Sequence, residues 1–131
     1  MAMERLKALS VRQPWIELIL SGRKTEELRS TSTAVRGRVY LYASKQRYDE
    51  SFERELEVQY DLADFDALPR GWIVGTVEIV DCRWDAEEAI WRWPLKNPRR
   101  LRTPLLPLTK PQPRFFHPFG KPEDDATFKG T

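Results

Sequence analysis

The chain has 131 residues, of which 40% are hydrophobic and 32% are charged, and its formal net charge is +2. This length predicts one domain, residues 1–131. The mean hydropathy is −0.61, and no apolar run approaches the roughly 20 residues that span a bilayer, which excludes a membrane protein. A single cysteine cannot form an internal disulfide and the first residues lack the apolar core of a secretion signal, so we expect a cytoplasmic protein.

The first predicted elements are a strand, a helix and a second strand. Residues 6–11 (LKALSV) alternate as a short strand does. Pro14 suits the first position of a helix that ends before Gly22, and this helix is apolar apart from Glu17, which indicates that it is covered on most sides. Because Gly22 ends the helix, we expect the charged segment 24–30 (KTEELRS) to be extended.

The middle of the chain predicts a strand, an acidic helix and a long strand. Residues 38–44 (RVYLYAS) are rich in β-branched and aromatic side chains. Residues 48–60 carry an apolar side chain at every fourth position with acids between them, which predicts a helix. Residues 71–82 (GWIVGTVEIVDC) form the clearest strand pattern, and Gly75 within it indicates a bulge or a close backbone approach.

The last third predicts mostly irregular structure. Residues 86–91 (AEEAIW) fit one short helical turn, and the prolines of residues 93–113 argue against regular elements there. Residues 114–119 (RFFHPF) predict a short strand, and we expect residues 120–131 to be a frayed tail. Together the elements predict an α+β fold, a small and mainly-β barrel with flanking helices, whose core spans about residues 6–119.

Few residues here suit metal or nucleophilic chemistry. The chain has one histidine and one cysteine, which excludes a Cys/His zinc site, and it carries no phosphate-binding glycine motif. His117 lies between Phe116 and Pro118 and Cys82 closes an apolar strand, so both are interpreted as packed side chains. We therefore expect neither a metal nor a cofactor.

Charge is strongly segregated along the sequence. Residues 1–48 hold ten Lys/Arg and four Asp/Glu, residues 49–88 hold three and thirteen, and residues 89–131 hold nine and three. The two basic thirds could fold into one positive face that attracts polyanions, although an acidic surface helix alone would give the same pattern. The acidic helix, residues 49–61, is also a candidate surface for a protein partner.

One set of charged and aromatic residues offers candidate ligand contacts. The set is Gln13, Trp15, Lys24, Glu27, Arg29, Tyr42, Ser44 and Lys45. Lys and Arg can hold phosphate, Glu can accept a hydrogen bond from an amino group, and aromatic rings can stack on bases. These residue types suit RNA, single-stranded nucleic acid or a nucleotide. The alternatives are that Glu27 and Arg29 form a structural ion pair across neighbouring strands and that Trp15 is a core residue.

The same residues resemble the signature of the ASCH domain, the activating signal cointegrator homology family. The resemblance rests on the segments ALSVRQPWIELILSGRKTEELRS, GRVYLYASK, GWIVGTVEIVDC and WPLKNPRRL, and it covers about residues 6–119. It implies a fold similar to the PUA domain and an RNA- or nucleic-acid-binding role. The implied site is a cleft between the Gln-Pro-Trp helix and the Lys-x-x-Glu-x-Arg strand.

The resemblance also implies an enzymatic alternative. Some small bacterial members hydrolyse the amide of N4-acetylcytidine, and ribonuclease activity is attributed to others. The amidohydrolases use a Lys, a nucleophilic Thr three residues later and a Glu on a later strand. Lys24 and Glu78 match this pattern, but Glu27 stands where the Thr would be, so we rank binding above catalysis. In an enzyme, Lys24, Glu27 and Glu78 would be the catalytic residues.

A departure from the family pattern lies near the C-terminal end of the resemblance. Many relatives have a glycine-rich turn before the last strand, whereas this chain has LTKPQPRFF, residues 108–116. The prolines replace flexibility by rigidity. We therefore expect this side of the cleft to have a different shape.

Overall fold

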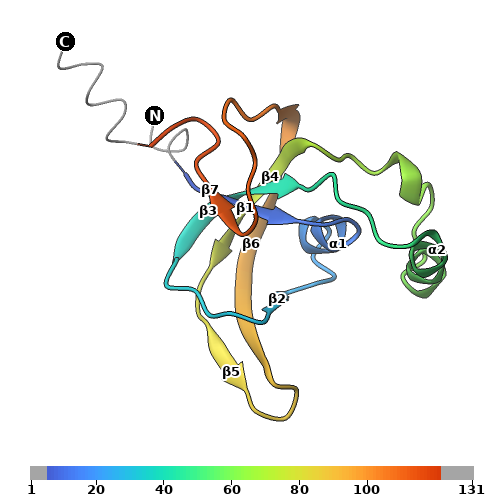
Figure 1. The fold of residues 1–131 in the computed structure, drawn as a ribbon, viewed down its shortest axis with the longest axis horizontal. Helices are drawn as coiled ribbons and strands as arrows, with labels where there is room; N and C mark the ends of the chain where they lie inside the picture. Colours follow the sequence, from blue (N-terminus) through green and yellow to red (C-terminus); the bar gives the residue numbers. More distant parts are fainter. Residues whose placement is uncertain (1–5, 122–131) are drawn as a thin grey trace.

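The computed structural model describes residues 6–121 as a curled, mainly-β sheet with two α-helices (Figure 1). The elements in chain order are β1 (Ala8–Val11), α1 (Trp15–Leu20), β2 (Glu26–Arg29), β3 (Gly37–Ala43), α2 (Glu50–Gln59), a 3₁₀ turn (Phe65–Ala67), β4 (Trp72–Ile79), β5 (Arg83–Asp85), β6 (Ile90–Leu105) and β7 (Phe115–Phe116). This confirms the expected barrel-like α+β fold. Among residues 6–121, no helix is long and apolar enough to cross a membrane.

The sheet is a half-barrel whose two sides approach each other at β1 and β2. Its strand order is β2-β6-β4-β3-β1-β7, with β5 paired to β6, and β1 runs parallel to β3. Among the strands of residues 6–121, no ladder of backbone hydrogen bonds joins β1 to β2. A side chain spans this gap instead, because the Arg29 guanidinium donates to the Ser10 carbonyl oxygen at 2.8 Å.

Two apolar clusters hold the sheet. The larger lies between the curled sheet and α1, where Ile16 and Ile19 pack with Leu41 and Trp93. The smaller lies on the other face of β3 and joins Tyr40 and Tyr42 to Phe116 of β7 and other residues. Alternate residues of a strand point to opposite faces, so β3 is buried on both sides, which explains its nearly continuous apolar sequence.

Three expected features are confirmed: the end of the first helix, the close approach at Gly75 and the acidic helix. The first helix ends at Leu20, and Gly22 follows with a φ of +81°, a left-handed conformation that favours glycine. The close approach expected at Gly75 is confirmed, because a Cβ atom there would lie 2.6 Å from the Arg99 carbonyl oxygen. The acidic helix is also confirmed, and Figure 1 shows α2 beside the sheet rather than on it.

The expectations for residues 86–105 were wrong. Residues 86–89 form the turn between β5 and β6 rather than a helical turn, and β6 is a strand of 16 residues. Proline is compatible with a strand at irregularities of the ladder, and the pairing of β6 with β4 shifts register around Pro98 and Pro104. Asn97, next to Pro98, has a φ of +52°. The expected tail is described only at Gly120 and Lys121; its remainder, residues 122–131, lies outside the described residues.

Candidate functional site

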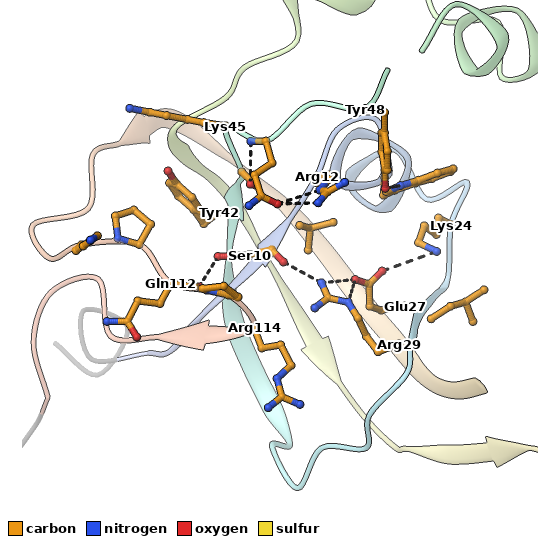
Figure 2. A pocket seen from close by; sticks show the side chains of 18 of the residues that line it. Ser10, Arg12, Lys24, Glu27, Arg29, Tyr42, Lys45, Tyr48, Gln112 and Arg114 are labelled. Carbon is orange, nitrogen blue, oxygen red and sulfur yellow. Dashed lines mark hydrogen bonds and ion pairs between the residues drawn. The ribbon is translucent and has the colours of Figure 1, made fainter. Parts of the chain in front are cut away.

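A cavity of about 850 Å³ opens at the gap between β1 and β2 (Figure 2). Its lining consists of residues 10–12, 15, 24, 27–29, 42, 44–46, 48, 60 and 110–114. Six lining residues are basic and one is acidic: Arg12, Lys24, Arg29, Lys45, Lys110 and Arg114 against Glu27. Four of the cations belong to the first basic third of the sequence and two to the last, so both thirds contribute to one positive surface.

Glu27 is the centre of the charged cluster. Its side chain is only 6% exposed, and its Oε2 accepts from the Nε atom of Arg29 at 2.7 Å while its Oε1 lies 3.8 Å from the Lys24 Nζ atom. The Glu27–Arg29 pair therefore exists, but within one strand rather than across two, because residues two apart on β2 share a face. Since this pair also lines the cavity, the structural and the ligand-binding interpretations of it are compatible.

Lys24 precedes β2 and is half-buried beside Glu27. Burial lowers the pKa of the Lys24 ammonium, the attraction of Glu27 opposes this change, and the repulsion of Arg29 adds to it. The Glu27 carboxylate thus holds the ammonium in a partly desolvated position at the cavity wall, against the repulsion of Arg29.

Trp15 and Tyr48 form the aromatic wall of the cavity. The Trp15 indole Nε1 donates to the Tyr48 hydroxyl at 2.8 Å, and the Trp15 ring meets Tyr60 edge to face at 5.7 Å. Cations lie over these rings, with Arg12 4.8 Å from the centroid of Tyr48 and Lys24 5.6 Å from that of Trp15. Trp15 is therefore neither a plain core residue nor an open stacking platform.

Tyr42 and Lys45 line the cavity at and beyond the end of β3. Tyr42 is 5% exposed, and burial raises the pKa of its hydroxyl, so the hydroxyl stays neutral. The Lys45 side chain crosses Gly71, where a Cβ atom would lie 2.7 Å from the Lys45 Cε atom and where φ is +84°. Gly71 is thus favoured by its backbone conformation, and a larger residue there would displace the flexible end of Lys45. Ser44, also at the cavity, accepts a hydrogen bond from the Gln46 amide at 3.1 Å.

The model of the ASCH domain family matches residues 9–106. The chain belongs to the ASCH domain family. Activating signal cointegrator 1 of Homo sapiens and that of Mus musculus are each 35% identical to it over 80 residues, which is 56% of this chain but 14% of those proteins. The chain therefore matches a small part of these relatives.

Two solved structures share the fold of this ASCH domain. The crystal structure of ASCH from Zymomonas mobilis matches with a TM-score of 0.58 at 12% identity, and the match covers 97% of this chain and 95% of that one. A serine-to-alanine mutant of the same bacterial protein matches with a TM-score of 0.56 at 12% identity, covering 98% and 96%. These matches confirm the PUA-like architecture expected from the sequence.

Two predicted site residues of this ASCH domain do not line the cavity. Gln13 is 2% exposed, and its amide donates to the Pro69 carbonyl oxygen at 2.9 Å and accepts from the Glu17 amide at 3.1 Å, so it orders the start of α1. Glu78 lies on β4 and accepts from Asn97 at 2.8 Å and Arg38 at 2.9 Å; these contacts hold the pKa of its carboxyl below the ordinary value. Glu78 is therefore not grouped with Lys24 and Glu27.

The sequence indicated the segment 108–116 as one side of the cleft, but it did not single out Arg12, Lys110 or Arg114 as lining residues. The signal available was the placement of Lys110 and Arg114 among the prolines of LTKPQPRFF. The structure brings this segment beside β1, where the Ser10 hydroxyl donates to the Gln112 carbonyl oxygen at 2.9 Å. Within residues 6–121, no group of three or more His, Cys, Asp or Glu side chains could hold a metal ion.

Proposed function

We propose that this ASCH domain binds RNA, or another single-stranded nucleic acid, in the cavity between β1 and β2. The observation that carries the proposal is the six-to-one excess of basic over acidic side chains around one cavity. Phosphate contacts supply most of the affinity of such complexes, and a basic groove with aromatic walls is the usual way to hold a single strand. Membership of the ASCH family supports the same proposal.

We assign phosphate binding first to the cations of the cavity that have no acidic partner among the described residues. Within the described residues, Arg12, Lys45, Lys110 and Arg114 form no ion pair, so binding a phosphate does not require them to break one. Arg29 has a different role, because its guanidinium is held by Glu27 and by the Ser10 carbonyl oxygen and is therefore fixed before a ligand arrives. A fixed cation binds an anion with less loss of side-chain entropy.

Glu27 acts as a positioning residue in this proposal. Both of its carboxylate oxygens already face a cation, Arg29 on one and Lys24 on the other. Because the side chain is only 6% exposed, little of the carboxylate is open to a base amino group, which is the role considered from the sequence. Base contacts fall instead to the exposed edges of the aromatic wall and to the Ser44 hydroxyl.

The test is the salt dependence of binding to a short labelled single-stranded RNA, followed by fluorescence anisotropy. We expect the double variant Lys45→Gln, Lys110→Gln to weaken binding and to lower the slope of log K against log salt by about 0.7 for each lost phosphate contact. The control is Lys96→Gln, Arg102→Gln, which changes the net charge equally at exposed positions outside the cavity. Equal losses in both double variants would mean that the cavity is not the site.

A second candidate function is hydrolysis of a modified nucleoside of the N4-acetylcytidine type or of RNA. The observation in its favour is that burial lowers the pKa of Lys24 beside the Glu27 carboxylate, which brings an amine closer to acid–base chemistry at neutral pH. Release of acetate from N4-acetylcytidine, or RNA cleavage, that is lost in both Lys24→Ala and Glu27→Gln would support this function. No turnover of either substrate by the intact chain would count against it.

A further inference from the structure

A second, smaller depression adjoins the cavity. We call it the side depression; it has a volume of about 320 Å³ and lies beside the loop Ser32–Ala34, with Trp93 and Phe115 behind it. Pro113 and Arg114 line both the cavity and the side depression. The two hollows are therefore neighbours, and Arg114 belongs to the boundary between them.

Arg114 is held at this boundary from both ends. Its backbone has a φ of +59°, an uncommon conformation for a residue other than glycine, and its carbonyl oxygen accepts from the Ser10 amide at 2.9 Å. Its guanidinium donates to the Thr31 hydroxyl at 2.5 Å. Figure 2 shows Arg114 and Gln112 on one side of Ser10 and the Lys24–Glu27–Arg29 cluster on the other. Strained residues that the surroundings hold in place are common at ligand sites.

We propose that Arg114 binds the phosphodiester between two consecutive nucleotides, of which one occupies the cavity and the next places its sugar and phosphate in the side depression. This inference rests on the proposed function and adds the ligand class, which is a chain of at least two nucleotides rather than a mononucleotide. Arginine suits the position because its planar group presents several donors to phosphate oxygens and has no acidic partner among residues 6–121.

The lining of the side depression fits a sugar-phosphate better than a base. Trp93 is fully buried and stacks on Phe115, with 5.8 Å between the ring centroids and an angle of 8°, so its ring is already covered. The loop opposite Arg114 consists of small residues, Ser32, Thr33 and Ala34, that leave room for a polar group. The match to the ASCH family model ends at residue 106, so this boundary is formed partly by a segment outside that match.

The test compares two dinucleotides that carry a 5′-phosphate and differ only in the linkage, one with the natural phosphodiester and one with a neutral methylphosphonate. We expect the intact chain to bind the phosphodiester form about tenfold more tightly, the factor for one charge-assisted contact. Arg114→Gln should weaken binding of the phosphodiester form to the level of the methylphosphonate form, so that the preference is lost. Calorimetry or competition against labelled RNA measures the affinity for each form.

A second variant tests the side depression without changing Arg114. Ala34→Glu places a negative charge in the loop of the depression and should also reduce the preference for the phosphodiester, whereas Thr103→Glu, at an exposed position that lines neither hollow, should not. The inference is overturned if Arg114→Gln weakens binding of both dinucleotides equally. It is also overturned if Arg114→Gln and Ala34→Glu both keep the preference of the intact chain for the phosphodiester.

The two proposals fail in different ways. If the Lys45→Gln, Lys110→Gln variant loses RNA binding but Arg114→Gln keeps the linkage preference, the cavity is the site and the role of Arg114 is wrong. If the intact chain binds neither RNA nor the dinucleotides, the proposed function is wrong and the inference falls with it.

Discussion

The Glu27→Gln substitution tests whether the charged cluster is a structural unit. It replaces the carboxylate by a neutral amide of nearly the same shape. Arg29 would keep the Ser10 carbonyl oxygen, at 2.8 Å, but would lose its charged partner, and Lys24 would lose its anionic neighbour. Two cations would then lie near each other at the cavity wall without the Glu27 carboxylate between them, so we expect the folded state to be destabilised.

The expected loss is about 2 kcal/mol. Removing one partner of a fully buried ion pair costs about 3–5 kcal/mol. The side chains of Lys24 and Arg29 are 19% and 22% exposed, so they keep part of their hydration, and the new amide can still accept one hydrogen bond. For a domain of this size the melting temperature should fall by about 8 °C.

Urea denaturation and thermal melting measure this loss, and Glu26→Gln is the matched control. Glu26 is adjacent to Glu27 on β2, but its side chain is a third exposed. Its partner Arg92 would still form an ion pair with Asp85 at 2.7 Å, so Glu26→Gln should lower the free energy of unfolding by less than about 1 kcal/mol. Equal stability of the two variants would refute the reasoning. A selective loss of binding to RNA rich in cytidine or adenine would instead show that Glu27 contacts base amino groups.

Three further predictions concern single positions. For Glu53, the hydrogen bond from Arg47 holds the carboxyl pKa below its ordinary 4.5, so the stability from this pair is present above pH 4.5 and is lost as the pH falls through the lower pKa of the folded state. The Glu53→Gln substitution should therefore flatten that part of the curve of stability against pH. An unchanged slope in urea titrations at several pH values would contradict this. The Lys24 pKa, measured by NMR, should lie below 10.5 and should fall further in Glu27→Gln, because the carboxylate attraction is removed; a rise would be inconsistent with the assigned causes. Gly75→Ala should lower stability by about 1–3 kcal/mol, because the new methyl group would crowd the β6 backbone, and a variant as stable as the original in thermal melting would count against this packing.

The parts of the fold that the sequence predicted are those with local signals. The helix Trp15–Leu20 has a proline before it, a glycine after it and an apolar interior, and β3 has β-branched and aromatic residues. β6 lacks such signals, because prolines interrupt its pattern and its ladder with β4 contains two register shifts. Its length depends on pairing with β4 and β5 and also with β2, which lies in the first third of the sequence.

The same distinction applies to the site. Glu27 and Arg29 could be found as a pair because residues two apart on an extended segment share a face, whereas the same alternation would put Lys24 on the opposite face. The resemblance placed the segment 108–116 at one side of the cleft, but the roles of Lys110 and Arg114 there could not be predicted, because they depend on contacts such as that between Ser10 and Gln112, which are 102 residues apart. Gln13 lies away from the cavity, and its amide is bonded to backbone groups, since a polar side chain at a helix start can serve the backbone.

The location of bound RNA tests the central claim most directly. Titration of a short single-stranded RNA into the labelled chain, followed by backbone amide chemical shifts in NMR, should give the largest changes at residues 10–12, 44–46, 112 and 114, around the cavity. The largest changes at the exposed basic residues 96–102 of β6, or on α2, with residues 10–12 and 44–46 unchanged, would contradict the account.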